Sequence, residues 1–158
     1  MKRYYLLFSV LFFFTVLWCS CTKNLFYEEV KSIKNETWNI DSVLHFEFNI
    51  TDPNQYYTFY IHIRNNTDFE TQNFYVFLTS EFPNGYIGKD TLGFILSTPA
   101  GEWTGKGNGR LKDNQFLYKE QVRFPQEGVY KFSIRQGMRE DNVKGIANFG
   151  MTLLKYNP

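Results

Sequence analysis

The stretch LHFEFNI at residues 44–50, followed by YTFYIHI at residues 57–63, decides the fold class. In each stretch apolar and polar residues alternate, which is typical of a strand with one buried and one wetted face. No stretch has the 3.6-residue apolar period of an amphipathic helix. Five further stretches of strand character follow, separated by turn residues: 74–78, 92–96, 115–124, 129–136 and 149–156. The chain is therefore predicted to be all-β, an antiparallel β-sandwich of the immunoglobulin-like or jelly-roll type.

Two segments give more specific expectations. Residues 74–78 are apolar on both faces, which predicts a central strand covered on two sides. Residues 125–128 have the composition of a tight turn. Tyr130 follows that turn at the position of a tyrosine corner, in which the hydroxyl hydrogen-bonds to an upstream backbone group.

The two histidines raise the question of a metal site. If residues 44–50 paired directly with residues 57–63, His45 would lie opposite His62 on the wetted face. A zinc site needs a third or fourth ligand, and Glu47 is the only nearby candidate. A solvated histidine pair is therefore the preferred interpretation, and no metal is predicted.

The N-terminus has the pattern of an export signal. Lys2 and Arg3 precede an apolar stretch at residues 4–17, which is shorter than the roughly 20 residues of a membrane-spanning helix. The small residue Ser20 stands directly before Cys21, as lipoprotein processing requires. We therefore predict a signal peptide at residues 1–20 and lipidation (palmitate) at Cys21, with conventional cleavage and an unmodified thiol as the alternative.

The rest of the chain divides into two predicted parts. Residues 21–36 are polar and mixed in charge, which predicts a tether, and residues 37–158 form the β-sandwich domain. After cleavage Cys21 is the only cysteine, so no disulfide can form within one mature chain. The chain has seventeen Lys and Arg and sixteen Asp and Glu, so its net charge is close to zero. The absence of a basic excess argues against a nucleic-acid partner.

A search for chemistry gives no catalytic site. The glycine-rich residues 101–110 lack the spacing of a phosphate-binding loop, because three residues instead of four separate Gly101 from Gly105. A surface or ligand-facing loop is the better interpretation. No Gly-x-Ser-x-Gly motif and no legible pair of carboxylates is present, so we predict a non-enzyme without a cofactor.

Three residues are candidate partner or ligand contacts: Trp103, Arg64 and Arg139. Each has a structural alternative, core or rim packing for the tryptophan and ion pairing for the arginines. Aromatic residues on a sandwich can also stack on sugars, and Trp103 in its loop makes a carbohydrate-binding lipoprotein the alternative function. Further stacking candidates are Trp38, Tyr56 and Tyr60.

A set of short motifs, in order, resembles the family of the gliding motility lipoprotein GldH. They are Arg64-Asn65, residues 73–77, Asp90-Thr91, Gly101-x-Trp103-x-Gly105-x-Gly107, Gly128-x-Tyr130-x-Phe132-x-Ile134, Gln136-Gly137-Met138-Arg139 and Gly145-Ile146-x-x-x-Gly150. The resemblance implies a Bacteroidetes envelope lipoprotein that is required for gliding and tied to type IX secretion, with no enzymatic activity. Its implied partners are other envelope lipoproteins or proteins of the secretion and motility complex.

The residues after Cys21 bear on location. Surface export in this phylum favours acidic residues directly behind the lipidated cysteine, and here Thr22, Lys23 and Asn24 follow. We therefore expect an outer-membrane lipoprotein that faces the periplasm.

Overall fold

The computed structural model describes residues 24–156. The predicted signal peptide and the predicted lipidation site, Cys21, lie outside this range. Within it, no helix is both long and apolar enough to span a bilayer.

The described residues form ten strands and one short 3-10 helix. In chain order these are β1 (Leu25–Ser32), η1 (Lys34–Glu36), β2 (Thr37–Asn39), β3 (Leu44–Ile50), β4 (Tyr56–Asn66), β5 (Asn73–Glu81), β6 (Ile87–Ile95), β7 (Leu111–Arg123), β8 (Gly128–Gln136), β9 (Asn142–Lys144) and β10 (Ile146–Tyr156).

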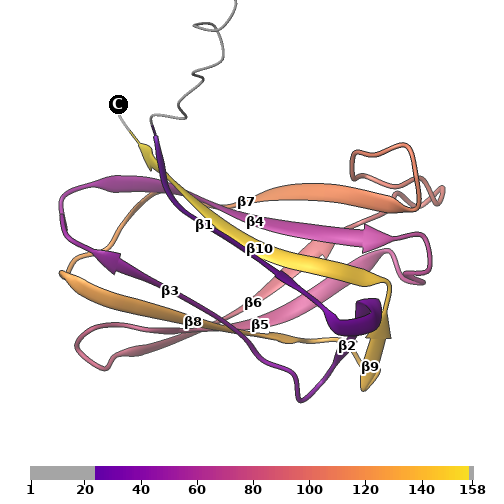
Figure 1. Cartoon of the computed structure of the whole chain (residues 1–158), viewed down its shortest axis with the longest axis horizontal. Helices are drawn as coiled ribbons and strands as arrows, with labels where there is room; N and C mark the ends of the chain where they lie inside the picture. Colours follow the sequence, from indigo (N-terminus) through magenta and orange to yellow (C-terminus); the bar gives the residue numbers. More distant parts are fainter. Residues whose placement is uncertain (1–23, 157–158) are drawn as a thin grey trace, which may run out of the picture.

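Two four-stranded antiparallel sheets pack face to face (Figure 1). The first sheet has the strand order β1-β10-β4-β7, the second has β3-β8-β5-β6, and β2 pairs with β9 in a small ribbon. Apart from β5 and β6, which form a hairpin within the second sheet, successive sheet strands alternate between the two sheets in a double Greek key, which is the jelly-roll arrangement of eight strands. The predicted β-sandwich is confirmed, and of the two types left open the jelly roll is the one formed.

The two ends of the sandwich differ in what they carry. At one end, the near end, the backbone N–H of Lys155 donates to the carbonyl of Asn24 over 2.7 Å, so the two ends of the described chain lie together. The turns at this end are residues 51–55, 82–86 and 124–127. The opposite, far end holds η1, the β2–β9 ribbon, and the connections 67–72, 96–110 and 137–141 (Figure 1).

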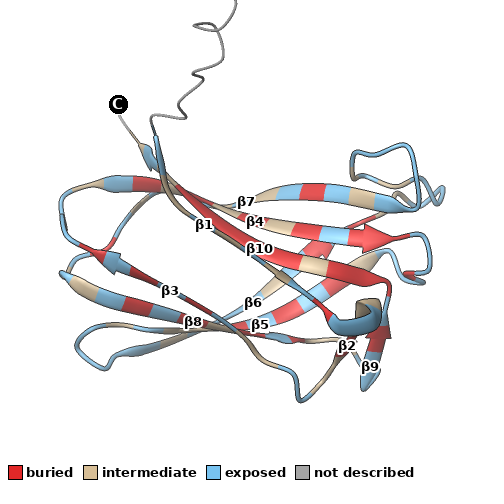
Figure 2. Ribbon diagram, in the orientation of Figure 1, coloured by how far each residue is buried: buried red, intermediate tan, exposed pale blue. Residues whose placement is uncertain are grey.

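Many of the buried side chains are aromatic, and buried residues alternate with more exposed ones along several strands (Figure 2). Phe48 is 6% exposed and has five rings around it, those of Phe26, Tyr27, Phe124, Tyr130 and Phe132, with centroids 5.2–6.2 Å away. Each such ring removes a large apolar area from water and gains from edge-to-face contacts. The core therefore needs no covalent cross-link.

The tyrosine corner predicted at Tyr130 is confirmed. Its hydroxyl donates to the carbonyl of Gln126 over 3.1 Å and accepts from the N–H of the same residue over 3.2 Å. The ring itself is fully buried. The turn before β8 is thus fastened to the core by one side chain.

The predicted start of the domain is wrong. Residues 25–32, assigned to the tether, form β1 and pair with β10 at the edge of the first sheet. Phe26 and Tyr27 both pack on Phe48. These two neighbours face the core together because the register shifts between Leu25 and Tyr27, and this bulge hides the period of two.

The predicted pairing of the two histidines is also wrong. The turn at residues 51–55 carries the chain from the second sheet to the first, so β3 and β4 do not pair. His45 instead lies opposite Ser133 on β8, with 3.0 Å between Nδ1 and Oγ. His62 lies between Gly150 and Gln115 in the other sheet.

The prediction that residues 74–78 form a strand covered on both faces is wrong. These residues belong to β5, which is central in its sheet, between β8 and β6. Phe74, Val76 and Leu78 are buried, but Tyr75 and Phe77 are 42% and 51% exposed on the outer face. Apolar composition on both faces here marks one core face and one exposed apolar face.

Candidate functional site

A groove of about 660 Å³ crosses the outer face of the first sheet in its half toward the far end. Strands β1, β4, β7 and β10 form its floor, and the loop between β6 and β7 forms one wall. Its polar lining includes Glu28, His62, Arg64, Lys106, Asp113 and Gln115. This groove is concave and lined by several charged and amide side chains, and it is our candidate site.

Arg64 and Asp113 form the charged centre of the groove. They are register partners on β4 and β7, and Nε of Arg64 donates to a carboxylate oxygen of Asp113 over 2.5 Å. This bond raises the pKa of Arg64, so the guanidinium stays charged. A guanidinium has five N–H donors and a carboxylate has two acceptor oxygens, so the pair retains groups for a polar ligand.

His62 adds a neutral polar group beside this pair. Gly150 opposite it has no side chain, and the Nε2 atom of His62 is buried without a hydrogen-bond partner among the described residues. Burial lowers the pKa of His62, while Glu28 and Asp113 act weakly in the other direction. The imidazole is therefore neutral near pH 7. Thr152 also holds a buried hydroxyl without a partner on the described chain.

The glycine-rich loop is fixed to the groove by hydrogen bonds. The hydroxyl oxygen of Thr104 lies 2.9 Å from the carbonyl oxygen of Ile95 and 3.1 Å from Oδ1 of Asn114, and its single proton is shared between these two acceptors. The amide of Asn114 donates in turn to Oδ1 of buried Asn65 over 2.8 Å. A side chain at Gly105 would collide with that amide at 2.8 Å. The loop wall that presents Lys106 is therefore held in place by buried amides.

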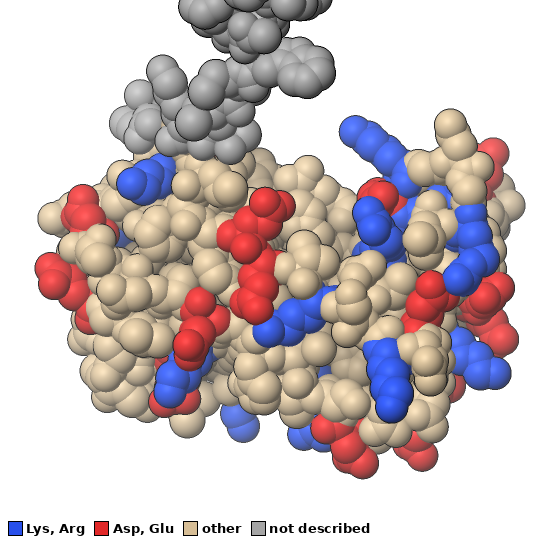
Figure 3. All heavy atoms as spheres, in the orientation of Figure 1, with Lys and Arg blue, Asp and Glu red and all other residues tan. Residues whose placement is uncertain are grey.

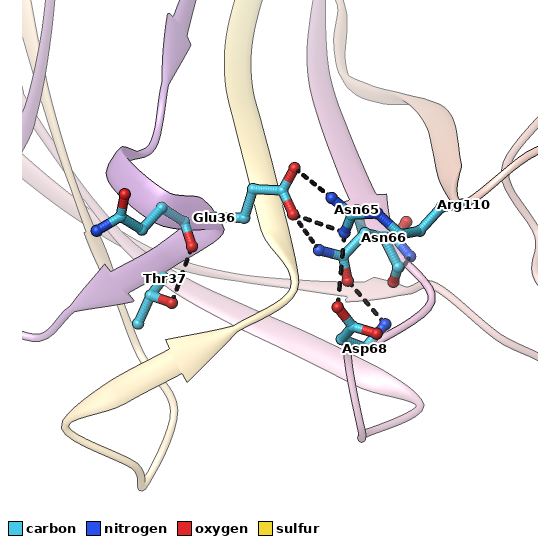
Figure 4. A network of polar contacts seen from close by, with 7 residues as sticks. Glu36, Thr37, Asn65, Asn66, Asp68 and Arg110 are labelled. Carbon is cyan, nitrogen blue, oxygen red and sulfur yellow. Dashed lines mark hydrogen bonds and ion pairs between the residues drawn. The ribbon is translucent and has the colours of Figure 1, made fainter.

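A second polar cluster, the far-end network, lies between η1 and the loops (Figure 4). Both terminal nitrogens of Arg110 donate to the carboxylate of Glu36, over 2.7 and 2.9 Å, and Asn66 donates to the same carboxylate over 2.5 Å. Arg110 lowers the pKa of Glu36, with Asn66 next in size. Asp68 lies 3.5 Å from Arg110. Since these groups bond to one another, the network joins three chain segments rather than offering a site.

The structure separates the three predicted contact residues. Arg64 lies in the groove. Trp103 is partly buried, packs against the core and is not a lining residue, although the neighbouring Thr104 is. Arg139 is exposed in the connection between β8 and β9, away from the groove lining. Whether any of the three contacts a partner stays a prediction.

The stacking candidates also separate. Trp38 is buried, and its indole N–H donates to the carbonyl of Ser42 over 3.0 Å, so its role is packing. Tyr56 is 43% exposed and Tyr60 is partly exposed on the outer face of the first sheet. Among residues 24–156, no three His, Cys, Asp or Glu side chains gather closely enough to hold a metal ion.

An exposed apolar patch on the second sheet was missed by sequence reasoning. Tyr75, Phe77 and Ile95 are each more than 40% exposed on its outer face. The ring of Tyr75 covers Gly93, and that of Phe77 lies against Gly137. Both rings therefore pack on the backbone of a glycine. The sequence feature that could have indicated this patch is the presence of glycines that lie beside aromatic residues of neighbouring strands. We call these three residues the aromatic patch.

Charge does not single out one kind of partner. Acidic and basic side chains are interspersed on the face seen in Figure 3, with uncharged areas between them. A surface of this kind does not produce the long-range field that steers highly charged ligands.

Two solved structures resemble the fold distantly. A carbohydrate-binding module from glycoside hydrolase family 9 (Cel9A) of Ruminococcus flavefaciens has a TM-score of 0.42 at 9% identity, over 82% of this chain and 98% of that one. The VP2 subviral particle of infectious bursal disease virus has a TM-score of 0.38 at 10% identity, over 87% and 34%. Similarity at this level supports no conclusion about ligand or function.

Sequence relatives are much closer. A gliding motility lipoprotein GldH homolog from Christiangramia forsetii is 38% identical over 157 residues, covering 94% of this chain and 96% of that protein. The gliding motility lipoprotein GldH of Flavobacterium johnsoniae is 29% identical over 152 residues, covering 92% and 94%. Residues 25–153, which span β1 to most of β10, match the GldH lipoprotein family. The chain therefore belongs to the GldH lipoprotein family.

Proposed function

We propose that this protein is an envelope lipoprotein that serves the gliding motility machinery as a non-enzymatic accessory component. The observation that carries the proposal is the match to two proteins named gliding motility lipoproteins over more than nine-tenths of both chains. Because the match includes the whole sandwich, it concerns this domain and not an added module.

The geometry supports binding rather than catalysis. The groove contains an ion pair and a neutral imidazole, but no nucleophile is placed beside a base there. The charged groups of the far-end network bond mainly to one another. The aromatic patch and the groove are left as exposed surfaces, and exposed aromatic rings are favoured at protein interfaces.

Lipid on Cys21 would hold the protein at the outer membrane, facing the periplasm, where it would contact other envelope lipoproteins or proteins of the type IX secretion complex. Two or more acyl chains anchor a protein far more stably than one. The Ser20-Cys21 pair and the residues behind it support this placement.

Deletion of the gene tests the proposal. In a gliding host, loss of the protein is expected to abolish spreading on agar and to reduce type IX export to the medium, and wild-type protein should restore both. A Phe77→Asp variant, which places a charge in the aromatic patch, is expected to restore less than a matched Val129→Asp variant on the same sheet. Normal spreading and export in the deletion strain would contradict the proposed role.

The polar groove favours a second candidate, a carbohydrate-binding lipoprotein. Paired charged groups and amides in a groove of about 660 Å³ suit the hydroxyl groups of a glycan. Binding on a glycan array that Arg64→Ala abolishes, while Arg135→Ala on the second sheet keeps it, would support this function. No binding to any glycan would exclude it.

A further inference from the structure

The outer face of the first sheet divides into two halves of different chemistry. Toward the far end lies the groove with the charged pair Arg64 and Asp113, and one exposed apolar residue, Val30, lines it too. Toward the near end the same face is apolar and aromatic, with Leu25 40%, Tyr56 43% and Leu117 54% exposed. Register places further partly exposed side chains on this half, on β4 and β10: Tyr60, Leu154 and Tyr156. We call these six residues the near-end patch.

The near-end patch lies where the chain enters the domain. Leu25 is the first residue of β1 and stands opposite Leu154. The preceding residue, Asn24, is bound through its carbonyl to the N–H of Lys155 over 2.7 Å. The position of residue 24 is thus fixed at the edge of this patch.

Three peptide units separate Asn24 from Cys21. A fully extended chain rises at most about 3.6 Å per residue, so the two Cα atoms are no more than about 11 Å apart. The tether predicted at residues 21–36 would have allowed about 50 Å by the same rule. The sandwich is itself long in comparison, because the 11 residues of β4 span about 37 Å. An anchor on Cys21 therefore restricts which surface can face away from the membrane.

We propose that the near-end patch rests on the lipid bilayer, so that the first sheet faces the membrane and the second sheet faces away from it. This inference rests on the proposed lipid anchor at Cys21. Tyrosine is favoured at the boundary between headgroups and acyl chains because its ring is apolar and its hydroxyl is polar. Exposed leucines beside these tyrosines would lose their contact with water there.

The charges around the patch suit phospholipid headgroups. Lys119, Arg123 and Lys155 are exposed along the neighbouring strand ends, with carboxylates at Glu120 and Asp52. Lys and Arg can extend their charged ends to phosphate while their methylene stems lie on apolar surface.

The orientation has a consequence for partner binding. The two sheets pack face to face, so a membrane against the outer face of the first sheet leaves the outer face of the second sheet exposed to the periplasm. The aromatic patch lies on that face. The bilayer and a protein partner would thus occupy opposite faces of one sandwich.

A pair of labelled variants tests the orientation. Leu117 in the near-end patch and Ile95 in the aromatic patch are both 54% exposed, so Leu117→Cys and Ile95→Cys are matched. Each full-length lipidated protein is labelled at the new cysteine with the environment-sensitive fluorophore NBD. It is then reconstituted into vesicles of phosphatidylethanolamine and phosphatidylglycerol that contain a spin-labelled lipid. We expect several-fold stronger quenching, and bluer emission, at position 117 than at position 95.

Flotation of the same vesicles separates the two proposals. Protein that floats with the vesicles but is quenched equally at both positions, or more strongly at position 95, overturns the orientation and leaves the lipid anchor standing. Protein that does not float overturns the anchor and the orientation together. Flotation that Cys21→Ala abolishes, with quenching confined to position 117, supports both.

Discussion

Both ends of the sandwich contain packed rings, but the far end adds a network of charged groups. There the ring of Phe69 packs on that of Phe74, with centroids 5.8 Å apart. At the near end, rings contact rings: Phe48 and Tyr57 both pack against Phe124, with centroids 5.2 and 5.7 Å apart. At the far end, Glu36, Asn66 and Arg110 exchange hydrogen bonds across three chain segments. Packing of rings depends on shape and little on pH, whereas a carboxylate network depends on its charge. The far end, where the groove wall and loops lie, is therefore the end that solution conditions can loosen.

Removing a central ring should have the largest effect. Phe48→Ala leaves a cavity among five aromatic neighbours, so we expect a loss of about 3–5 kcal/mol in the free energy of unfolding. Chemical denaturation of the purified protein measures it. The control is Phe77→Ala on the exposed aromatic patch, with an expected loss of about 1 kcal/mol or less. Equal losses would mean that the near end does not depend on its rings.

At the far end the most sensitive position is a glycine. Gly145 has φ +89°, and a Cβ there would lie 2.5 Å from the backbone nitrogen of Phe69. Gly145→Ala is therefore expected to cost about 2–3 kcal/mol, from backbone strain and from displacement of the 67–72 connection. Gly101→Ala is the matched control, because Gly101 has φ +82° with nothing within 4 Å. Its expected cost is about 1 kcal/mol. Similar costs at both positions would show that the close approach to Phe69 is unimportant.

Among the polar contacts of the near end is the tyrosine corner, which should matter less than the rings. Tyr130→Phe removes the hydroxyl that bonds to both backbone groups of Gln126 while keeping the ring. We expect a loss of about 1–2 kcal/mol by the same denaturation assay. Tyr86→Phe, at a tyrosine that is 62% exposed, should change nothing measurable. If Tyr130→Phe left the free energy of unfolding unchanged, the tyrosine corner would have no stabilising role.

Strand location was predictable because the period of two is a local property. Residues 44–50 were predicted as a strand and form β3 with the same bounds. Strand pairing was not predictable, because the period fixes which face a residue occupies but not which strand lies beside it. The predicted pairing of the two histidines was wrong for this reason. Likewise, the residue type of an apolar residue such as Phe77 does not show whether its face of the sheet is buried or exposed.

The candidate site was predictable only in part. Arg64 could be singled out by its residue type, and it lies in the groove. Its neighbours come from β7, from β1 and from the loop before β7, so their approach depends on the jelly-roll connections. Glu36 could not be anticipated, because it belongs to a segment whose sequence reads as a polar tether.

Acidification should weaken the far end through Glu36. Its pKa is lowered below the ordinary value of 4.5 by Arg110. A carboxyl with a lowered pKa contributes stability above 4.5 that is lost as pH falls through the folded-state value. The protection factors of the amides of Asn66 and Gly145, both bonded across this junction, should therefore fall in acid. In Glu36→Gln the protection should already be lower at neutral pH and should change less in acid. The same pH dependence in both proteins would exclude Glu36 as the cause.

The smallest expected effect concerns His62, and it separates the groove from the far-end network. Burial lowers the pKa of His62 below 6.5, so the folded state favours the neutral ring. The stability that this provides is present above pH 6.5 and declines as pH falls below it, toward the folded-state value. Acid should thus act on the groove before it acts on Glu36. NMR titration of the imidazole measures the pKa directly, and Glu28→Gln should lower it further, because Glu28 raises it. A pKa at or above 6.5 would mean that burial does not favour the neutral ring and would contradict the prediction.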